Sequence, residues 1–271
     1  MKVAIIGRGF GSYAMKPAYR TLGWEVEMIA ARDGAAVDVA CSGDADLISV
    51  HSPPFQHREH VLKAIAGGKH VLCDKPFGRN AAEAAEMRDA AQAAGLLHFV
   101  NYEFRHQPAR IKARELIESG AIGQFCHMAT TSFANYLHGR PHGWLNEADL
   151  GGGWIGAYGS HVIDALRWYT GGEVAQCGGV LRIDAPAHAD EGGVEVKATA
   201  EDAYSMWFTT NIGVSASLDV AFSLPVSLPQ RMQFIGTEGL IELIDNNVLT
   251  LHRGGVEPEL FDLSPPAGER V

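Results

Sequence analysis

The sequence predicts an α/β protein in two parts, a doubly wound parallel sheet followed by an α+β domain built on a mostly antiparallel sheet. In the first hundred or so residues, short continuous apolar runs alternate with helical segments, which is typical of a parallel sheet covered on both faces. From Gln124 on, apolar and polar residues alternate, as in strands with one exposed face. A boundary near Gly120 gives domains 1–119 and 120–271.

The first domain begins with an apolar run at 3–6, a glycine-rich turn and a helix that ends at Leu22. Further strands are expected at 26–30, 47–50, 70–73 and 97–100. The helix before the last strand begins at Asn80, with Glu83 three residues on, a variant of the capping box.

The second domain contains strands and one helix. One face of an expected strand carries Val214, Ala216, Leu218, Val220 and Phe222. Residues 210–213, TNIG, predict the hairpin turn before this strand. The helix is expected at 159–169 and is followed by Gly171.

Composition and charge exclude several classes of protein. The 271 residues carry a net charge of −10, from 32 acidic and 22 basic side chains, and form no basic stripe, so nucleic acid is not an expected partner. No apolar run is long enough to span a membrane and the amino terminus, MKVAIIG, has no apolar leader, so we expect a cytoplasmic protein without membrane partners. Buried thiols in a reducing compartment are expected at Cys41, Cys73, Cys126 and Cys177.

A glycine-rich turn, Gly7-Arg8-Gly9-Phe10-Gly11, follows the first strand and opens the first helix. Glycines there let backbone N–H groups and the helix N-terminus approach a pyrophosphate. The third glycine stands one place earlier than in GxGxxG, where this chain has Ser12, and such a turn can also merely connect a strand to a helix. Its placement predicts a Rossmann-type cofactor site at Gly7, Gly9, Phe10 and Gly11.

The tip of the second strand reads Ala30-Ala31-Arg32-Asp33 and should read the ribose of a cofactor. Arg32 suits the 2′-phosphate of NADP, whereas Asp33 leaves NAD open because an acid can bind a free 2′-hydroxyl. A solvated Arg-Asp pair in a loop is the alternative. We expect NADP in preference to NAD.

The segment VLCDKPFG, residues 71–78, places two opposite charges where the fourth strand leaves the sheet. Asp74 and Lys75 are costly there unless they have a role. Ligands of open α/β sheets bind at the carboxyl ends of strands, so Lys75 is a candidate to polarise a carbonyl, stabilise an alkoxide or move a proton. A surface lysine paired with a neighbouring acid is the alternative.

Four segments, GRGFGS, HSPPFQH, CDKPFG and GGGWIGAYGSHVID, resemble the Gfo/Idh/MocA family in their order and in the change of domain between them. These are the glucose–fructose oxidoreductase and inositol dehydrogenase relatives, and the similarity spans most of the chain. The resemblance implies an NAD(P)-dependent oxidoreductase acting on CH–OH groups and a polyhydroxylated small-molecule substrate. It also implies a homodimer or homotetramer formed through the second sheet.

The resemblance assigns roles to single residues. Lys75 is implied to lie beside the nicotinamide and the reacting hydroxyl, in a lysine–proline peptide that is often cis. Residues implied to lie near the cofactor are His51, Pro53, His57, Asp74, Lys75 and Pro76. His161 is implied to exchange the substrate proton, which suits an imidazole near neutral pH; a hydrogen-bonded core histidine is the alternative.

Substrate contacts are expected after the last strand and in the loop before the triple glycine. The residues are Asn101, Glu103, Arg105, Arg140, Trp144 and His161. Their side chains suit a hydroxylated or carboxylated molecule, and ordinary loop surface is the alternative. His57 and His60 could form a metal pair, but without a third ligand we expect no metal.

The chain departs from the family pattern in three places. Ala157 stands where many members carry an aspartate that pairs with the histidine, and Asp164, three residues after His161, could orient the imidazole instead. The thirteen residues between Asp33 and Leu47 fit one short crossover and no extra strand. The carboxyl end comes early, so the second domain is expected to be shortened.

These features predict an oxidoreductase that transfers a hydride between nicotinamide and a sugar, polyol or related hydroxy or keto compound. Lys75 would polarise the reacting oxygen and His161 would relay its proton. Two alternatives stay open: a catalytically impaired cofactor-binding sensor or scaffold, and a redox-neutral NAD-using glycosidase of the same family.

Overall fold

The computed structural model describes residues 1–265 and divides into two compact units. Among the described residues, one unit comprises 1–102 with 147–152, and the other comprises 103–146 with 153–265. The division falls before the boundary expected near Gly120 because helix α5 (Pro108–Glu118) packs on the second sheet, where Ala109 and Ala113 are fully buried in the core.

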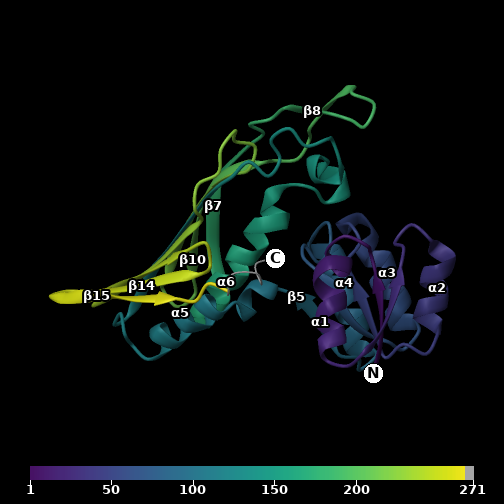
Figure 1. Ribbon diagram of the computed structural model, residues 1–271, viewed down its shortest axis with the longest axis horizontal. Helices are drawn as coiled ribbons and strands as arrows, with labels where there is room; N and C mark the ends of the chain where they lie inside the picture. Colours follow the sequence, from purple (N-terminus) through teal and green to yellow (C-terminus); the bar gives the residue numbers. More distant parts are fainter. Residues whose placement is uncertain (266–271) are drawn as a thin grey trace. The chain divides into compact units, whose positions relative to one another are not determined.

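The N-terminal unit contains a parallel sheet (Figure 1). Its strands are β1 (Lys2–Ile6), β2 (Glu25–Ile29), β3 (Leu47–Val50), β4 (His70–Asp74) and β5 (His98–Asn101). Among the described residues the sheet has five strands in the order β2-β1-β3-β4-β5, all parallel. The chain passes from β1 to β2 toward one side of the sheet and from β3 to β4 toward the other, so the strand order reverses between β1 and β3. Ligands of such sheets bind at the carboxyl ends of the strands where the order reverses.

Helices cover both faces of this sheet. They are η1 (Gly11–Met15), which continues into α1 (Lys16–Thr21), then α2 (Gly34–Ser42), α3 (Pro54–Ala66) and α4 (Ala81–Ala93). Alternate residues of β1 enter two different apolar clusters, Ala4 and Ile6 in one and Val3 and Ile5 in the other. Helix α2 alone connects β2 to β3, as the short crossover predicts.

The C-terminal unit is built on a mixed sheet with helices α5 and α6 (Ser160–Thr170) (Figure 1). Its strands are β6 (Phe125–Phe133), β7 (Val174–Arg182), β10 (Ala203–Thr210), β11 (Ser215–Ala221), β12 (Arg231–Gly236), β13 (Gly239–Ile244), β14 (Val248–Arg253) and β15 (Val256–Asp262). Within residues 1–265 these eight strands pair in the order β15-β14-β13-β12-β6-β11-β10-β7, and only β6 and β11 run parallel. The strands β8 (Ala187–Ala189) and β9 (Glu195–Lys197) form a separate hairpin.

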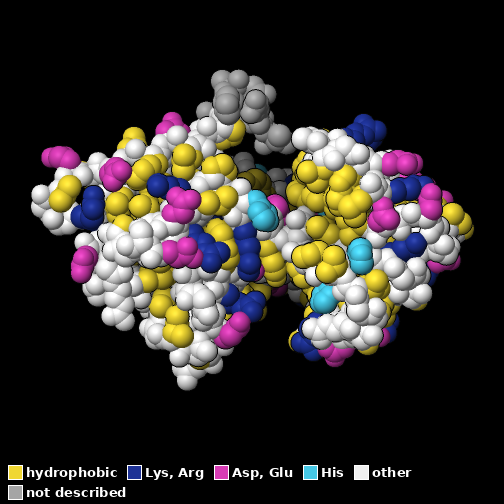
Figure 2. Space-filling view, turned by 90° about the horizontal axis from the view of Figure 1, so that it is seen from below, with side chains coloured by type: hydrophobic (Ala, Val, Ile, Leu, Met, Phe, Trp, Pro, Cys, Tyr) yellow, Lys and Arg dark blue, Asp and Glu magenta, His cyan; other side chains and the backbone are white. Residues whose placement is uncertain are grey.

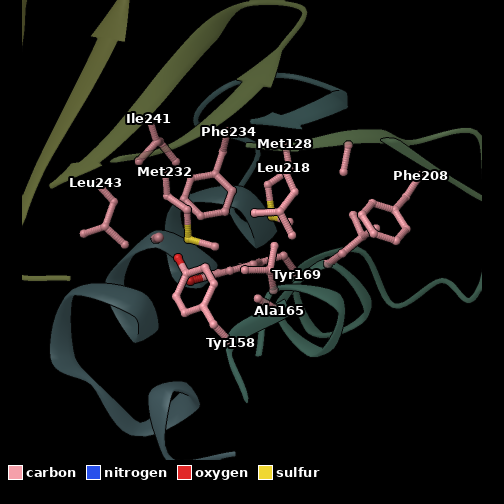
Figure 3. Close-up of a cluster of buried hydrophobic side chains, with 14 of the residues drawn as sticks. Met128, Tyr158, Ala165, Tyr169, Phe208, Leu218, Met232, Phe234, Ile241 and Leu243 are labelled. Carbon is pink, nitrogen blue, oxygen red and sulfur yellow. The ribbon is translucent and has the colours of Figure 1, made fainter. Parts of the chain in front are cut away.

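The core of this unit lies between the sheet and the two helices. Figure 3 shows Tyr158, Ala165 and Tyr169 facing side chains of the sheet, among them Phe234. The residues expected on one face of β11, from Val214 to Phe222, are all buried in this cluster. Across the described chain, we find no helix whose length and apolar character would allow it to cross a membrane.

Candidate active site

The three glycines of the first turn have three different surroundings. Gly7 has φ +115°, and a Cβ there would collide with the carbonyl group of His51. A Cβ on Gly11 would lie 2.7 Å from the side chain of Ile5, so this glycine lets the helix pack on the sheet. A Cβ on Gly9 would meet nothing within 4 Å. Tight turn, open approach and close packing are the three functions of glycine in a dinucleotide site, so the turn fits a pyrophosphate.

The tip of β2 holds its two charged residues differently. Asp33 is the N-cap of α2, and its carboxylate accepts a hydrogen bond of 3.0 Å from the N–H of Ala36. Arg32 is exposed. One oxygen of the Asp33 carboxylate thus caps a helix, and this exposed carboxylate has a second oxygen that can accept a hydrogen bond from a ribose hydroxyl.

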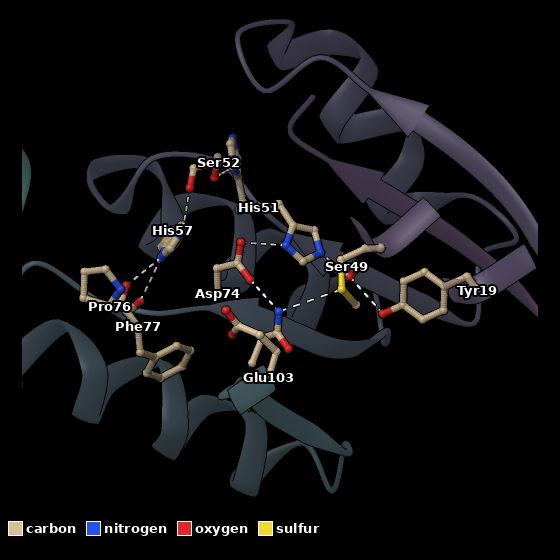
Figure 4. A network of polar contacts seen from close by, with 12 residues as sticks. Tyr19, Ser49, His51, Ser52, His57, Asp74, Pro76, Phe77 and Glu103 are labelled. Carbon is tan, nitrogen blue, oxygen red and sulfur yellow. Dashed lines mark hydrogen bonds and ion pairs between the residues drawn. The ribbon is translucent and has the colours of Figure 1, made fainter. Parts of the chain in front are cut away.

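A chain of hydrogen bonds links the carboxyl ends of β3, β4 and β5 (Figure 4). The buried ring of His51 donates from Nδ1 to Asp74 over 2.7 Å, and Asn101 donates to the same carboxylate over 2.8 Å. His51 Nε2 lies 2.7 Å from Ser49 Oγ, which lies 3.0 Å from the hydroxyl of Tyr19. The Ser49 hydroxyl thus links the imidazole of His51 to the phenol of Tyr19. Asp74 is thus a hydrogen-bonded anchor of the strand ends, and Asn101 is its partner.

Lys75 follows this anchor, and the peptide bond between Lys75 and Pro76 is cis, as the resemblance implied. The lysine is half-buried. Phe10, from the glycine turn, lies near the same strand ends with its ring centroid 5.9 Å from that of His51. The N-terminal unit therefore brings together the glycine turn, His51, Asp74 and Lys75.

His57 is enclosed beneath the two loops and does not line their surface (Figure 4). Its Nε2 lies 2.6 Å from the carbonyl oxygen of Ser52, and its Nδ1 lies 3.0 Å from that of Pro76. Burial lowers the pKa of His57, and the two carbonyl oxygens oppose that shift. Pro53, the N-cap of α3, belongs to the first of these loops. His57 thus ties the loops after β3 and β4 together, a supporting role in place of direct cofactor contact.

The imidazoles of His57 and His60, considered above as a pair of metal ligands, make hydrogen bonds to protein groups. His60 Nδ1 lies 2.9 Å from the hydroxyl of Ser52. In the part of the chain that the structure describes, no group of three or more His, Cys, Asp or Glu side chains is placed to hold a metal ion.

His60 should make stability depend on pH. Burial lowers the pKa of His60 from 6.5 to about 4. The pKa of His60 is lower in the folded than in the unfolded protein, so neutral His60 is compatible with folding and protonation opposes it. The free energy of unfolding should therefore be unaffected by His60 above pH 6.5 and should fall, by up to about 3 kcal/mol, as the pH drops from 6.5 to 4. Urea unfolding of the parent and of His60→Asn at pH 7.5 and 4.5 tests this, since the asparagine cannot titrate. Equal pH dependence in both proteins would rule out the contribution.

The triple glycine precedes the helix that carries His161. A Cβ on Gly153, which has φ +95°, would collide with the carboxylate of Glu201. That carboxylate accepts a hydrogen bond of 2.9 Å from the N–H of Ile155, the first residue of η5 (Ile155–Gly159), which runs directly into α6. Gly153 therefore makes room for an acid that caps the helix bearing His161, where negative charge is favourable.

His161 is 2% exposed and lies beside η2 (Glu103–His106). Its ring stacks on that of Phe104, and its Nε2 lies 3.6 Å from Glu103 Oε1. Asp164 does not orient the imidazole as considered from the sequence. Its carboxylate instead accepts two hydrogen bonds, of 2.7 and 2.5 Å, from Arg105, because a guanidinium offers the bidentate geometry that an imidazole lacks. Glu103 and His161 are thus brought together, while Arg105 is committed to an ion pair.

Arg140 and Trp144 lie in the loop that follows β6. Arg140 is exposed and lines a hollow of about 340 Å³ with His138, His188 and Asp190. Trp144 begins η3 (Trp144–Asn146) and is half-buried. The contacts of His161 with Glu103 and Phe104 come from η2 instead.

Several supporting residues were not predicted. Tyr19, Ser49 and Glu201 carry no motif, and each contacts a residue 30 or more positions away in the sequence. Phe104 lies next to the predicted Glu103, so its position after the last strand was the one available signal.

Comparisons with known proteins agree with this architecture. Residues 111–242 match the family model described as "GFO/IDH/MocA C-terminal domain", and residues 35–102 match that described as "Oxidoreductase family, NAD-binding Rossmann fold". The 1,5-anhydro-D-fructose reductase of Ensifer adhaerens is 33% identical over 208 residues, which are 76% of this chain and 59% of that protein. The chain spans about half the length of the curated relatives it matches.

Solved structures share the fold. Levoglucosan dehydrogenase in complex with NADH and levoglucosan gives a TM-score of 0.86 at 20% identity, over 97% of this chain and 80% of that one. A super-repressor mutant of Gal80p from Saccharomyces cerevisiae gives 0.83 at 19% identity, over 97% and 79%. Because two models of one family match the two parts of the chain in order, and the folds agree, the chain belongs to the GFO/IDH/MocA family of NAD-binding oxidoreductases.

Proposed function

We propose that this protein binds a nicotinamide cofactor and transfers a hydride between it and a sugar, polyol or related hydroxy or keto compound. The surroundings of Gly7, Gly9 and Gly11 carry the proposal, because they fit the three requirements of a pyrophosphate turn. The matched reductase of Ensifer adhaerens is named for a sugar substrate, which supports this substrate class.

A bound nicotinamide supplies a hydride donor or acceptor, and the chain supplies the groups that bind and move protons. In this proposal the Lys75 ammonium donates a hydrogen bond to the substrate oxygen, which favours an alkoxide or polarises a carbonyl. His161 exchanges the proton of that oxygen. Asp74, held by His51 and Asn101, fixes the strand end from which Lys75 projects.

We also propose that NADP is preferred, because the Arg32 guanidinium is exposed at the tip of β2, where it suits a 2′-phosphate, while one oxygen of the neighbouring Asp33 caps α2. Titration with NADPH and NADH, followed by nicotinamide fluorescence, tests binding and preference together. Tighter NADPH binding that Arg32→Ala removes is the expected result. Binding of neither cofactor by the folded protein would contradict the proposed function, and an unchanged preference in the variant would contradict the role of Arg32.

A cofactor-binding sensor without turnover is the second candidate, and Ala157 favours it because the family aspartate is missing there. The fold is shared by a dehydrogenase and a repressor, so fold alone does not decide. Tight cofactor binding without oxidation or reduction of any compound in a polyol and keto-sugar screen would favour the sensor.

We further propose that two copies associate through the C-terminal sheet. Large apolar side chains are exposed on its neighbouring strands β7 and β10, with Val180 61% and Trp207 48% exposed. Figure 2 shows hydrophobic side chains exposed among charged ones on one face of the molecule. Exposed apolar patches mark interaction surfaces. Sedimentation velocity should give a dimer or tetramer for the parent and a smaller species for Trp207→Glu; a monomeric parent would exclude the association.

A further inference from the structure

The aromatic ring of Phe104 and the imidazole of His161 form a face-to-face stack in the C-terminal unit. Their centroids are 4.0 Å apart and their planes differ by 17°. Phe104 comes from η2 and His161 from the first turn of α6, so two elements distant in sequence fix this contact. A stacked partner restricts rotation of the imidazole, and Phe104 therefore sets the plane in which the two ring nitrogens of His161 lie.

Phe104 is itself held by Arg110. The guanidinium carbon lies over the Phe104 ring, 5.0 Å from its centroid, and the side chain is buried, with Arg110 1% exposed. Its Nε donates a hydrogen bond of 2.8 Å to Asn246. Within residues 1–265 no carboxylate forms an ion pair with Arg110. Its position is therefore set by the aromatic ring and the amide, because a buried cation needs such compensating contacts.

Glu103 approaches the edge of the same imidazole. Its Oε1 lies 3.6 Å from His161 Nε2, longer than a hydrogen bond but within ion-pair distance of a protonated ring. A carboxylate on this side favours the tautomer with the proton on Nε2, which leaves Nδ1 as the base. Once Nδ1 has taken a proton, the carboxylate stabilises the imidazolium without being protonated itself.

We propose that Glu103 and Phe104 are positioning residues for His161, with Glu103 supplying the carboxylate that Ala157 cannot. The inference rests on the proposed function, in which His161 exchanges the substrate proton. In the oxidative direction the hydroxyl proton passes to the imidazole while the carbon gives up its hydride to the cofactor. A C=O bond and an imidazolium result, and the reverse reaction returns both.

Steady-state kinetics separate positioning from a general loss of stability. Phe104→Leu and Glu103→Gln should each lower kcat about 10- to 100-fold, with KM and the Kd of the cofactor unchanged, because a misplaced base costs rate without costing binding. Phe104→Tyr keeps the ring and should stay near the parent. The matched control is Phe261→Leu, because it removes a ring that Lys112 of the same helix α5 covers at 5.0 Å, whereas the ring stacked on His161 is that of Phe104. Full kcat in Phe104→Leu, or equal losses in the leucine and tyrosine variants, would overturn the proposal.

A second readout does not require turnover. The carbon-bound protons of the His161 ring are shielded by a stacked aromatic neighbour, and their resonance can be assigned by its loss in His161→Gln. We expect it to move downfield in Phe104→Leu and to stay in place in Phe261→Leu; no movement in either would overturn the stack. If the parent shows no turnover but this resonance moves, the proposed function fails while the positioning contact stands.

Discussion

Replacing Lys75 with alanine should lower kcat by roughly 10²- to 10⁴-fold while the Kd of the cofactor stays close to that of the parent. The ammonium is the charged group placed directly after the anchored end of β4, where a reacting oxygen would develop negative charge. Asp74 keeps its hydrogen bonds to His51 and Asn101 in the variant, so the cofactor turn should keep its shape.

Lys69 provides the matched control for this substitution. It precedes the same strand at its amino end, and its Nζ donates to the carbonyl oxygen of Gly43 over 2.6 Å. Lys69→Ala removes an equal charge from the amino end of the same strand, far from the carboxyl end that Lys75 follows, so turnover should change little. Unchanged turnover in Lys75→Ala, or equal losses in both variants, would exclude a catalytic role for Lys75.

Two alanine substitutions in the glycine turn should affect different properties, one the affinity for the cofactor and the other the stability of the fold. Gly9→Ala should keep the melting temperature and weaken cofactor binding about 10- to 100-fold, because its Cβ meets no protein atom but occupies the approach of a pyrophosphate. Gly7→Ala should instead destabilise the fold by about 3 kcal/mol, since φ is +115° and the Cβ collides with His51.

Thermal unfolding by circular dichroism and titration by nicotinamide fluorescence measure both effects on the same samples. Parent-like cofactor affinity in Gly9→Ala would mean that this turn does not hold a pyrophosphate. A parent-like melting temperature in Gly7→Ala would mean that the turn can relax around a side chain.

The sequence predicted local features well because they depend on neighbours in the chain. Asn80 caps α4 by accepting from the N–H of Glu83, and the alternation from Val214 to Phe222 places those residues in the core. Contacts between residues far apart in the sequence could not be predicted in this way. The spacing of His161 and Asp164 favours a contact on one helical face, but Arg105, 59 residues away from Asp164, takes the carboxylate. Likewise, no residue near the triple glycine in the sequence indicates that Glu201 contacts it.

The hydrogen-bonded chain from Tyr19 to Asn101 has a thermodynamic consequence. It joins α1, the loop after β3 and the ends of β4 and β5, and most of its members are buried. Strand ends that are hydrogen-bonded to one another in this way cannot fluctuate independently. The carboxyl ends of these strands therefore lose their conformational entropy when the protein folds. A ligand that binds there therefore has little ordering left to induce, and more of its contact energy appears as affinity.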